Sequence, residues 1–81
     1  MLTTTQLAQK IDDWVFNRRD RQLLKARLLD GATFAELADM TDMSVNGVKS
    51  RYARALSAFE DAMQADGYQP TDYIHTNQAE A

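Results

Sequence analysis

Residues 33–59 read TFAELADMTDMSVNGVKSRYARALSAF, and this stretch decides the fold. Thr33 and Glu36 have the spacing of a capping box, in which each side chain binds a free backbone amide at the start of a helix. They predict a short helix over 34–40. Ser44 is a favoured N-cap, so a longer helix is expected to begin directly after it. Two helices joined by a turn of about three or four residues are typical of a helix-turn-helix.

The longer helix is expected to run from 45 to about 65, with one apolar and one polar side. The apolar side recurs at intervals typical of a helix face. It comprises Val45, Val48, Tyr52, Ala55, Leu56, Phe59 and Met63. Val48 is expected to pack against Leu37 of the shorter helix.

The polar side of this helix is a candidate DNA-binding surface. It carries Asn46, Gly47, Ser50, Ala53, Arg54 and Ser57, flanked by Lys49 and Arg51. Amide, hydroxyl and guanidinium groups can hydrogen-bond to base edges, and lysine can neutralise phosphate.

Two more helices are expected upstream. One covers about 6–16, and the threonines at 3–5 are its N-cap candidates. Its apolar stripe comprises Leu7, Ile11, Trp14 and Val15, and Trp14 is expected in the core. The next runs from 18 or 20 to 30, and Gly31 ends it because glycine tolerates the left-handed conformation. Its apolar side comprises Leu23, Leu24 and Leu28.

Gly67 is expected to end the long helix, and the remaining residues are polar, aperiodic and interrupted by Pro70. We therefore expect an all-α fold. It is a small four-helix domain over 1–67 that contains the helix-turn-helix. A flexible polar tail is expected over 68–81.

Composition limits the function classes. The chain has 81 residues, enough for one domain, and it contains no cysteine, which excludes disulfide and thiolate-metal scaffolds. No apolar run approaches the roughly 20 residues that span a bilayer, and the N-terminus lacks the features of a secretory signal. We expect a soluble, cytoplasmic protein with no membrane partner.

Charge is distributed unevenly along the chain. The net charge is −3, but residues 17–54 carry eight Lys and Arg against five Asp and Glu. Residues 55–81 carry five acidic residues and no Lys or Arg. The basic middle suits an anionic partner, although solvated helix faces explain the same charges.

Residues 17–59 resemble region 4 of bacterial sigma factors and, less closely, the LuxR-type DNA-binding domain. The resemblance is carried by RQLLKARLLDG, by TFAELA and above all by SVNGVKSRYARAL. In the sigma family this region recognises the promoter −35 element and contacts RNA polymerase. The resemblance therefore implies double-stranded DNA as a partner, with RNA polymerase or another protein as a second.

Together the helix pattern and the resemblance assign the candidate site. The DNA-binding residues are Ser44, Asn46, Gly47, Lys49, Ser50, Arg51 and Arg54. Candidate phosphate contacts are Arg18, Arg19, Lys25 and Thr33.

Two positions depart from the family pattern. Thr41 and Asp42 stand in the turn where a large apolar residue and glycine are usual. Asp42 can adopt the left-handed conformation at modest cost, although its charge should weaken DNA binding somewhat. Gly47 stands where threonine is common, and a close approach to DNA or tolerance at a helix start would explain it.

No feature predicts an enzyme, a cofactor or a metal site. The adjacent acidic pairs at 12–13 and 60–61 point in different directions on their helices, whereas acid–base catalysis needs convergence. His75 is the sole histidine, and it lies in the expected tail. The glycines are isolated, so no phosphate-binding loop is expected.

The leading hypothesis is a sequence-specific DNA-binding protein, a transcription regulator that inserts residues 45–54 into the major groove. A complete sigma factor is not expected, because 81 residues leave no room for the segment that melts the −10 element. One alternative is an adaptor that docks on RNA polymerase or another large complex without touching DNA. Another is a phage packaging or recombination component. We also expect a homodimer, formed through Phe59 and Met63 or through Trp14.

Overall fold

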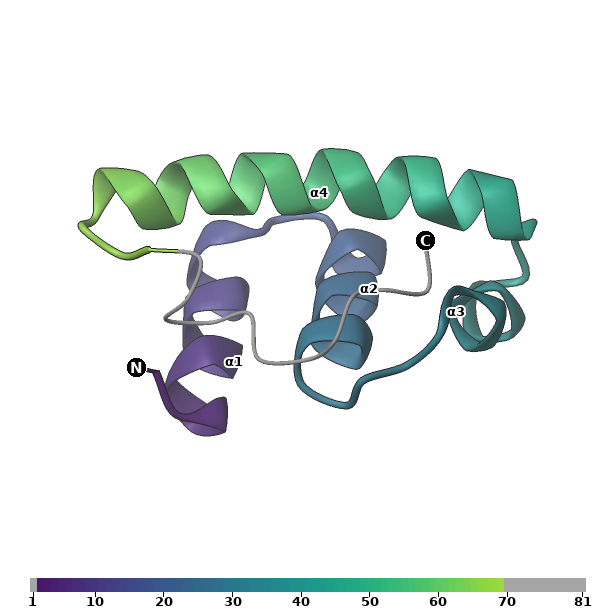
Figure 1. The fold of residues 1–81 in the computed structure, drawn as a ribbon, viewed down its shortest axis with the longest axis horizontal. Helices are drawn as coiled ribbons and strands as arrows, with labels where there is room; N and C mark the ends of the chain where they lie inside the picture. The colour runs from purple at the N-terminus through teal and green to yellow at the C-terminus, as the bar shows by residue number, and fades with distance from the viewer. Residues whose placement is uncertain (1, 70–81) are drawn as a thin grey trace.

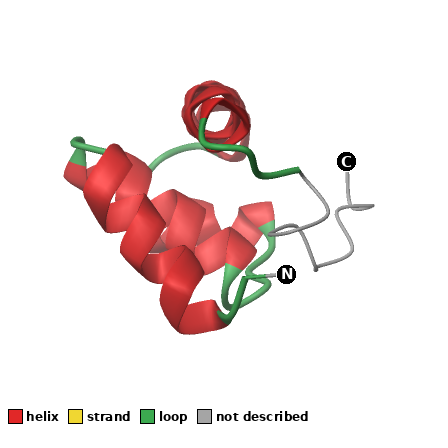
Figure 2. Cartoon of the chain, turned by 90° about the vertical axis from the view of Figure 1, so that its left-hand side faces the viewer, coloured by secondary structure: helices red, strands yellow, loops and turns green. Residues whose placement is uncertain are grey.

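The computed structural model describes residues 2–69, which form four α-helices (Figure 1). They are α1 (Thr4–Trp14), α2 (Arg18–Leu28), α3 (Phe34–Thr41) and α4 (Val45–Ala65). α4 lies across the other three, with α1 under its C-terminal half and α3 under its N-terminal end (Figure 1). Seen along α4, the three shorter helices form a layer below it (Figure 2). The all-α fold is confirmed.

Each helix begins at a side-chain cap, and the caps of α3 and α4 are those that the sequence predicted. Thr33 and Glu36 form the predicted capping box, and the amide of Thr33 holds the pKa of Glu36 below its usual value. Ser44 Oγ accepts from the amide of Gly47 at 3.0 Å. Thr3 caps α1, so this helix begins and ends about two residues earlier than predicted.

The turns use the left-handed conformation where the sequence predicted it. Asp42 ends α3 with φ 56° and ψ 36°. Gly31 follows α2 with φ 71°, and Gly67 follows α4 with φ 91°. A short polar side chain at Asp42 therefore replaces the usual glycine without breaking the turn.

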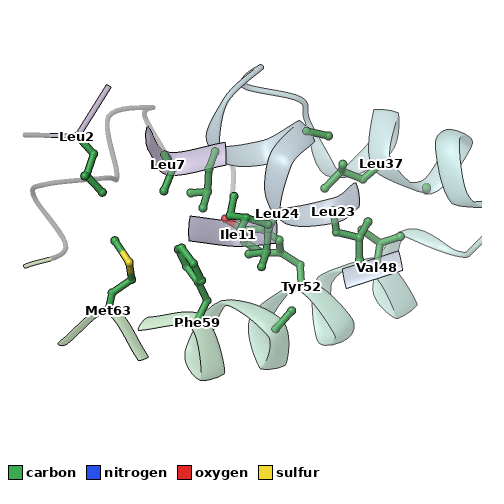
Figure 3. Packing of buried hydrophobic residues seen from close by; sticks show 14 residues of the cluster. Leu2, Leu7, Ile11, Leu23, Leu24, Leu37, Val48, Tyr52, Phe59 and Met63 are labelled. Carbon is green, nitrogen blue, oxygen red and sulfur yellow. The ribbon is translucent and has the colours of Figure 1, made fainter. Parts of the chain in front are cut away.

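The core runs along the underside of α4 (Figure 3). At one end Val48 lies with Leu37 and Leu23, and at the other Phe59 and Met63 lie near Leu7. The predicted α3–α4 contact is thus part of a core that continues through the whole domain. The fully buried side chains are Phe59, Leu7, Ile11, Leu23, Leu24, Leu37, Met63 and Val48.

Three expectations need correction. Val45 was placed in the apolar stripe but is 41% exposed, because it begins α4 at the end of the core. Phe59 and Met63 are buried within the domain, so they cannot form a dimer surface. Tyr68, assigned to the tail, packs against the core.

Trp14 is partly buried and packs against the core, where its ring lies 6.4 Å from that of Phe59. The predicted tail beyond Gln69 lies outside the described residues, as does His75.

The register of α4 predicts opposite outcomes for its two N-terminal valines. Val48→Asp is expected to unfold the domain, because it buries an unpaired charge at a fully buried position. Val45→Asp is the matched control and is expected to change stability by no more than about 0.5 kcal/mol, as exposed substitutions usually do. Thermal unfolding followed by circular dichroism measures both. Equal melting temperatures for Val48→Asp and the wild type would show that the register is wrong.

Candidate nucleic-acid interface

α3 and α4 are joined by a short, well-defined turn. The amide of Asp42 donates to the carbonyl oxygen of Ala38, and so does that of Met43, at 3.2 Å. The hydroxyl of Thr41 donates to the carbonyl oxygen of Leu37 at 2.7 Å. These three hydrogen bonds satisfy carbonyl oxygens at the C-terminal end of α3 and close the turn before α4.

The N-terminal half of α4 presents three polar side chains to solvent. Asn46, Ser50 and Arg54 are exposed, and their spacing of four residues places them on one face. The opposite face carries the buried Val48 and Tyr52. The predicted division of α4 into a buried side and an outward polar side is therefore present over these turns.

Ser44 and Gly47 act together at the start of α4. The Ser44 hydroxyl oxygen accepts from the Gly47 amide. A Cβ atom at Gly47 would lie 3.0 Å from that same oxygen. Glu36 occupies the same position relative to its cap Thr33 and carries a side chain, so the cap alone does not require glycine at 47.

Lys49 is held beside an aromatic group of α3. Its Nζ lies 5.6 Å from the centroid of the Phe34 ring, and the Arg27 guanidinium lies 4.3 Å from the same centroid. Tyr52 meets this ring edge-on with centroids 5.7 Å apart. The Lys49 ammonium group thus lies within cation–π range of the ring, and the side chain remains partly exposed to solvent.

Arg51 is directed to α2 instead of outward. Its Nε donates to Oδ1 of Asp20 at 2.8 Å, and its Nη2 donates to Oδ1 of Asn17 at 3.1 Å. Asn17 and Asp20 were not predicted as site residues, because both residue types are common at a helix start. No local spacing reveals a pair whose members are 31 and 34 residues apart.

The candidate phosphate contacts fall into two groups. Arg18 and Arg19 are exposed at the start of α2, next to Asn17 and Asp20, which reach α4. Arg18 and Arg19 are therefore placed at the end of α2 that contacts α4.

Lys25 and Thr33 are engaged in contacts within the domain. Lys25 Nζ pairs with Oδ1 of Asp12 on α1 at 2.6 Å. The Thr33 hydroxyl oxygen accepts from the amide of Glu36. The structure brings neither side chain to the outward face of α4.

Grouped metal ligands and membrane-spanning helices are absent from the part of the chain that is described. Over residues 2–69, no three His, Asp or Glu side chains are grouped so as to hold a metal ion. None of the four helices is long and apolar enough to cross a bilayer.

Comparison with known proteins matches one family to this region. The family described as Sigma-70, region 4 matches residues 17–59. The matched residues cover α2, α3 and most of α4, including every candidate DNA-binding residue. No curated protein and no solved structure matches the chain.

Because Tyr52 is buried, we expect the free energy of unfolding to fall at alkaline pH. Burial raises the pKa of Tyr52 from 10.0 to about 12, with the charge of Arg27 opposing the rise. The unfolded chain therefore loses the phenolic proton first, so stability is fully present below pH 10 and falls between about pH 10 and 12. Two pKa units correspond to about 2–3 kcal/mol.

Urea unfolding at neutral pH and near the upper end of this range measures the effect. Tyr52→Phe is the control, because it removes the titrating group, and it should lose less stability on the change of pH than the wild type. Equal losses in the two proteins would contradict the assignment.

Proposed function

The chain belongs to the sigma-70 region 4 family, a helix-turn-helix family that binds DNA, and we propose that it is a sequence-specific DNA-binding protein that regulates transcription. In this proposal the N-terminal half of α4, residues 45–54, enters the major groove of double-stranded DNA. α3 lies against the phosphate backbone. The domain is then positioned by phosphate contacts and reads sequence through α4.

One observation carries the proposal. Asn46, Ser50 and Arg54 are exposed on one face of a helix whose other face is anchored in the core. An amide, a hydroxyl and a guanidinium can each bind base edges, and a helix fits the width of the major groove. Because the same helix runs back through the whole core, the three groups are presented on a rigid support.

Phosphate contacts are proposed for the side chains that border this face. Lys49 is partly exposed on α4, and Arg18 and Arg19 are exposed at the start of α2. The free amides at the start of α4, next to Ser44, add the positive end of the helix dipole.

A second candidate function is an adaptor that docks on RNA polymerase without binding DNA. The net charge of −3 favours it, and so does the acidic Asp42 in the turn. Salt separates the two proposals, since phosphate contacts give affinity that falls steeply with salt.

The test is fluorescence anisotropy of the full chain with mixed-sequence duplex DNA over a series of salt concentrations. Lys49→Ala is expected to weaken all sequences alike and to lower the salt slope by about one unit, as expected for one lost phosphate contact. Arg54→Ala is expected to relax sequence preference, at about 1–3 kcal/mol for the preferred site.

Lys10→Ala serves as the control for net charge. Lys10 lies on α1 and pairs with Asp66 beyond the far end of α4, with 3.7 Å between Nζ and Oδ2. This variant should bind DNA nearly as the wild type does. Absence of binding at low salt by a folded wild-type protein would refute the DNA proposal and favour the adaptor.

A further inference from the structure

The contact between Arg51 and the start of α2 ties the candidate DNA-binding helix to a distant part of the chain. The Arg51 and Asp20 side chains are about one-third and one-quarter exposed, so their ion pair is partly shielded from water. Asn17 adds a second acceptor for the same guanidinium. Two hydrogen bonds from one planar group restrict its orientation more than a single ion pair does.

The acceptors for Arg51 are held in place by the start of α2. Asn17 Oδ1 accepts from the amides of Arg19 and Asp20, at 2.9 and 3.1 Å, and also from Arg51. Asp20 lies in the first turn of α2, where the helix dipole stabilises a carboxylate. The oxygens that receive Arg51 are thus preorganised by the cap of α2.

Arg54 lies next to this pair without joining it in the structure. A surface pocket is lined by Asp20, Arg51 and Arg54 together with Ala55 and Ala58. Asp20 is bound by Arg51, whereas Arg54 is exposed and has no ion pair with any residue over 2–69. The Asp20 carboxylate therefore shares a pocket with two arginines, but only Arg51 binds it.

We propose that Arg51 is a positioning residue for DNA recognition: by occupying Asp20 and Asn17, it leaves Arg54 directed toward DNA. This inference rests on the proposed function. Arg51, predicted from the sequence as a direct DNA contact, is thereby assigned a positioning role. Asn17 and Asp20 take part in recognition by binding it.

Loss of Arg51 has a specific consequence. In Arg51→Ala, Asp20 keeps its charge without its partner, and Arg54 is the cation that lines the same pocket. Asp20 then draws Arg54 away from DNA. We expect affinity for a preferred duplex to fall about fivefold or more, at the lower end of the loss for a base-reading arginine.

Removing Asp20 as well distinguishes positioning from direct contact. In Arg51→Ala/Asp20→Asn, no carboxylate competes for Arg54, so affinity and salt slope are expected to return close to the wild-type values. The control is Arg51→Ala/Asp61→Asn, which has the same net charge. Asp61 is exposed toward the C-terminal end of α4 and is not among the residues that bind Arg51, so this control should stay as weak as Arg51→Ala.

A measurement without DNA tests the pair itself. Melting temperatures of the wild type, Arg51→Ala, Asp20→Asn and the double variant form a double-mutant cycle. Coupling is expected, so that the double variant loses less than the sum of the two single losses. Circular dichroism checks that each protein is folded at the temperature of the binding experiments.

The outcomes separate the hypotheses. Recovery of binding with Asp20→Asn but not with Asp61→Asn supports the positioning role. A double variant that binds no better than Arg51→Ala, with the salt slope lowered by about one unit in both, would show that Arg51 contacts phosphate directly. Additive melting temperatures would overturn the pairing. If the melting temperatures show coupling but the wild-type protein binds no duplex, the proposed function is refuted, and the Arg51–Asp20 pair is only a contact between α2 and α4.

Discussion

The domain depends on the burial of one face of α4 against the three shorter helices. This helix has 21 residues and supplies Val48, Tyr52, Ala55, Phe59 and Met63 to the core. Chains of this length bury a modest share of their surface, so no other element could replace that contribution. Because a helix is rigid, burial of Phe59 and Met63 at one end also fixes the rotation of Asn46 and Ser50 at the other. The core contacts at the C-terminal half thereby determine which side chains face outward at the N-terminal half.

Local signals explain how much of the fold could be predicted. Each helix start has a side-chain cap, and the turn after α3 has a residue that adopts the left-handed conformation. These features act over three or four residues, so they are visible in the sequence. The start of α1 was missed by about two residues because Thr3, Thr4 and Thr5 are equally good caps in isolation. Val45 was assigned to the core because helical periodicity shows the direction of a side chain but does not show where the core ends.

The candidate site was predicted less completely, for a related reason. Exposure of Asn46, Ser50 and Arg54 follows from the periodicity of α4, and the structure agrees. The role of Arg51 does not follow, because its position at the edge of the polar face suits an outward or an inward direction equally. Its partners are on another helix, and their composition indicates only a helix start. Contacts within a helix turn leave a pattern in the sequence, whereas contacts between distant polar side chains depend on how the helices pack.

The uneven charge of the domain bears on how a protein of net charge −3 could approach DNA. Arg18, Arg19 and Arg54 are exposed near the start of α2 and the middle of α4, whereas Asp61 and Asp66 are exposed toward the end of α4. Glu36, Asp39 and Asp42 are also exposed, on and directly after α3, so the two signs are only partly separated along the domain. Exposed charges farther apart than about 8–10 Å are largely screened at physiological salt, so the field that DNA meets depends on the charges close to the proposed interface. Asp61 and Asp66 would be repelled by DNA and would favour approach by the N-terminal half of α4. Net charge alone therefore argues weakly against DNA binding here, because it counts the exposed acids at the end of α4 equally with the charges beside the proposed interface.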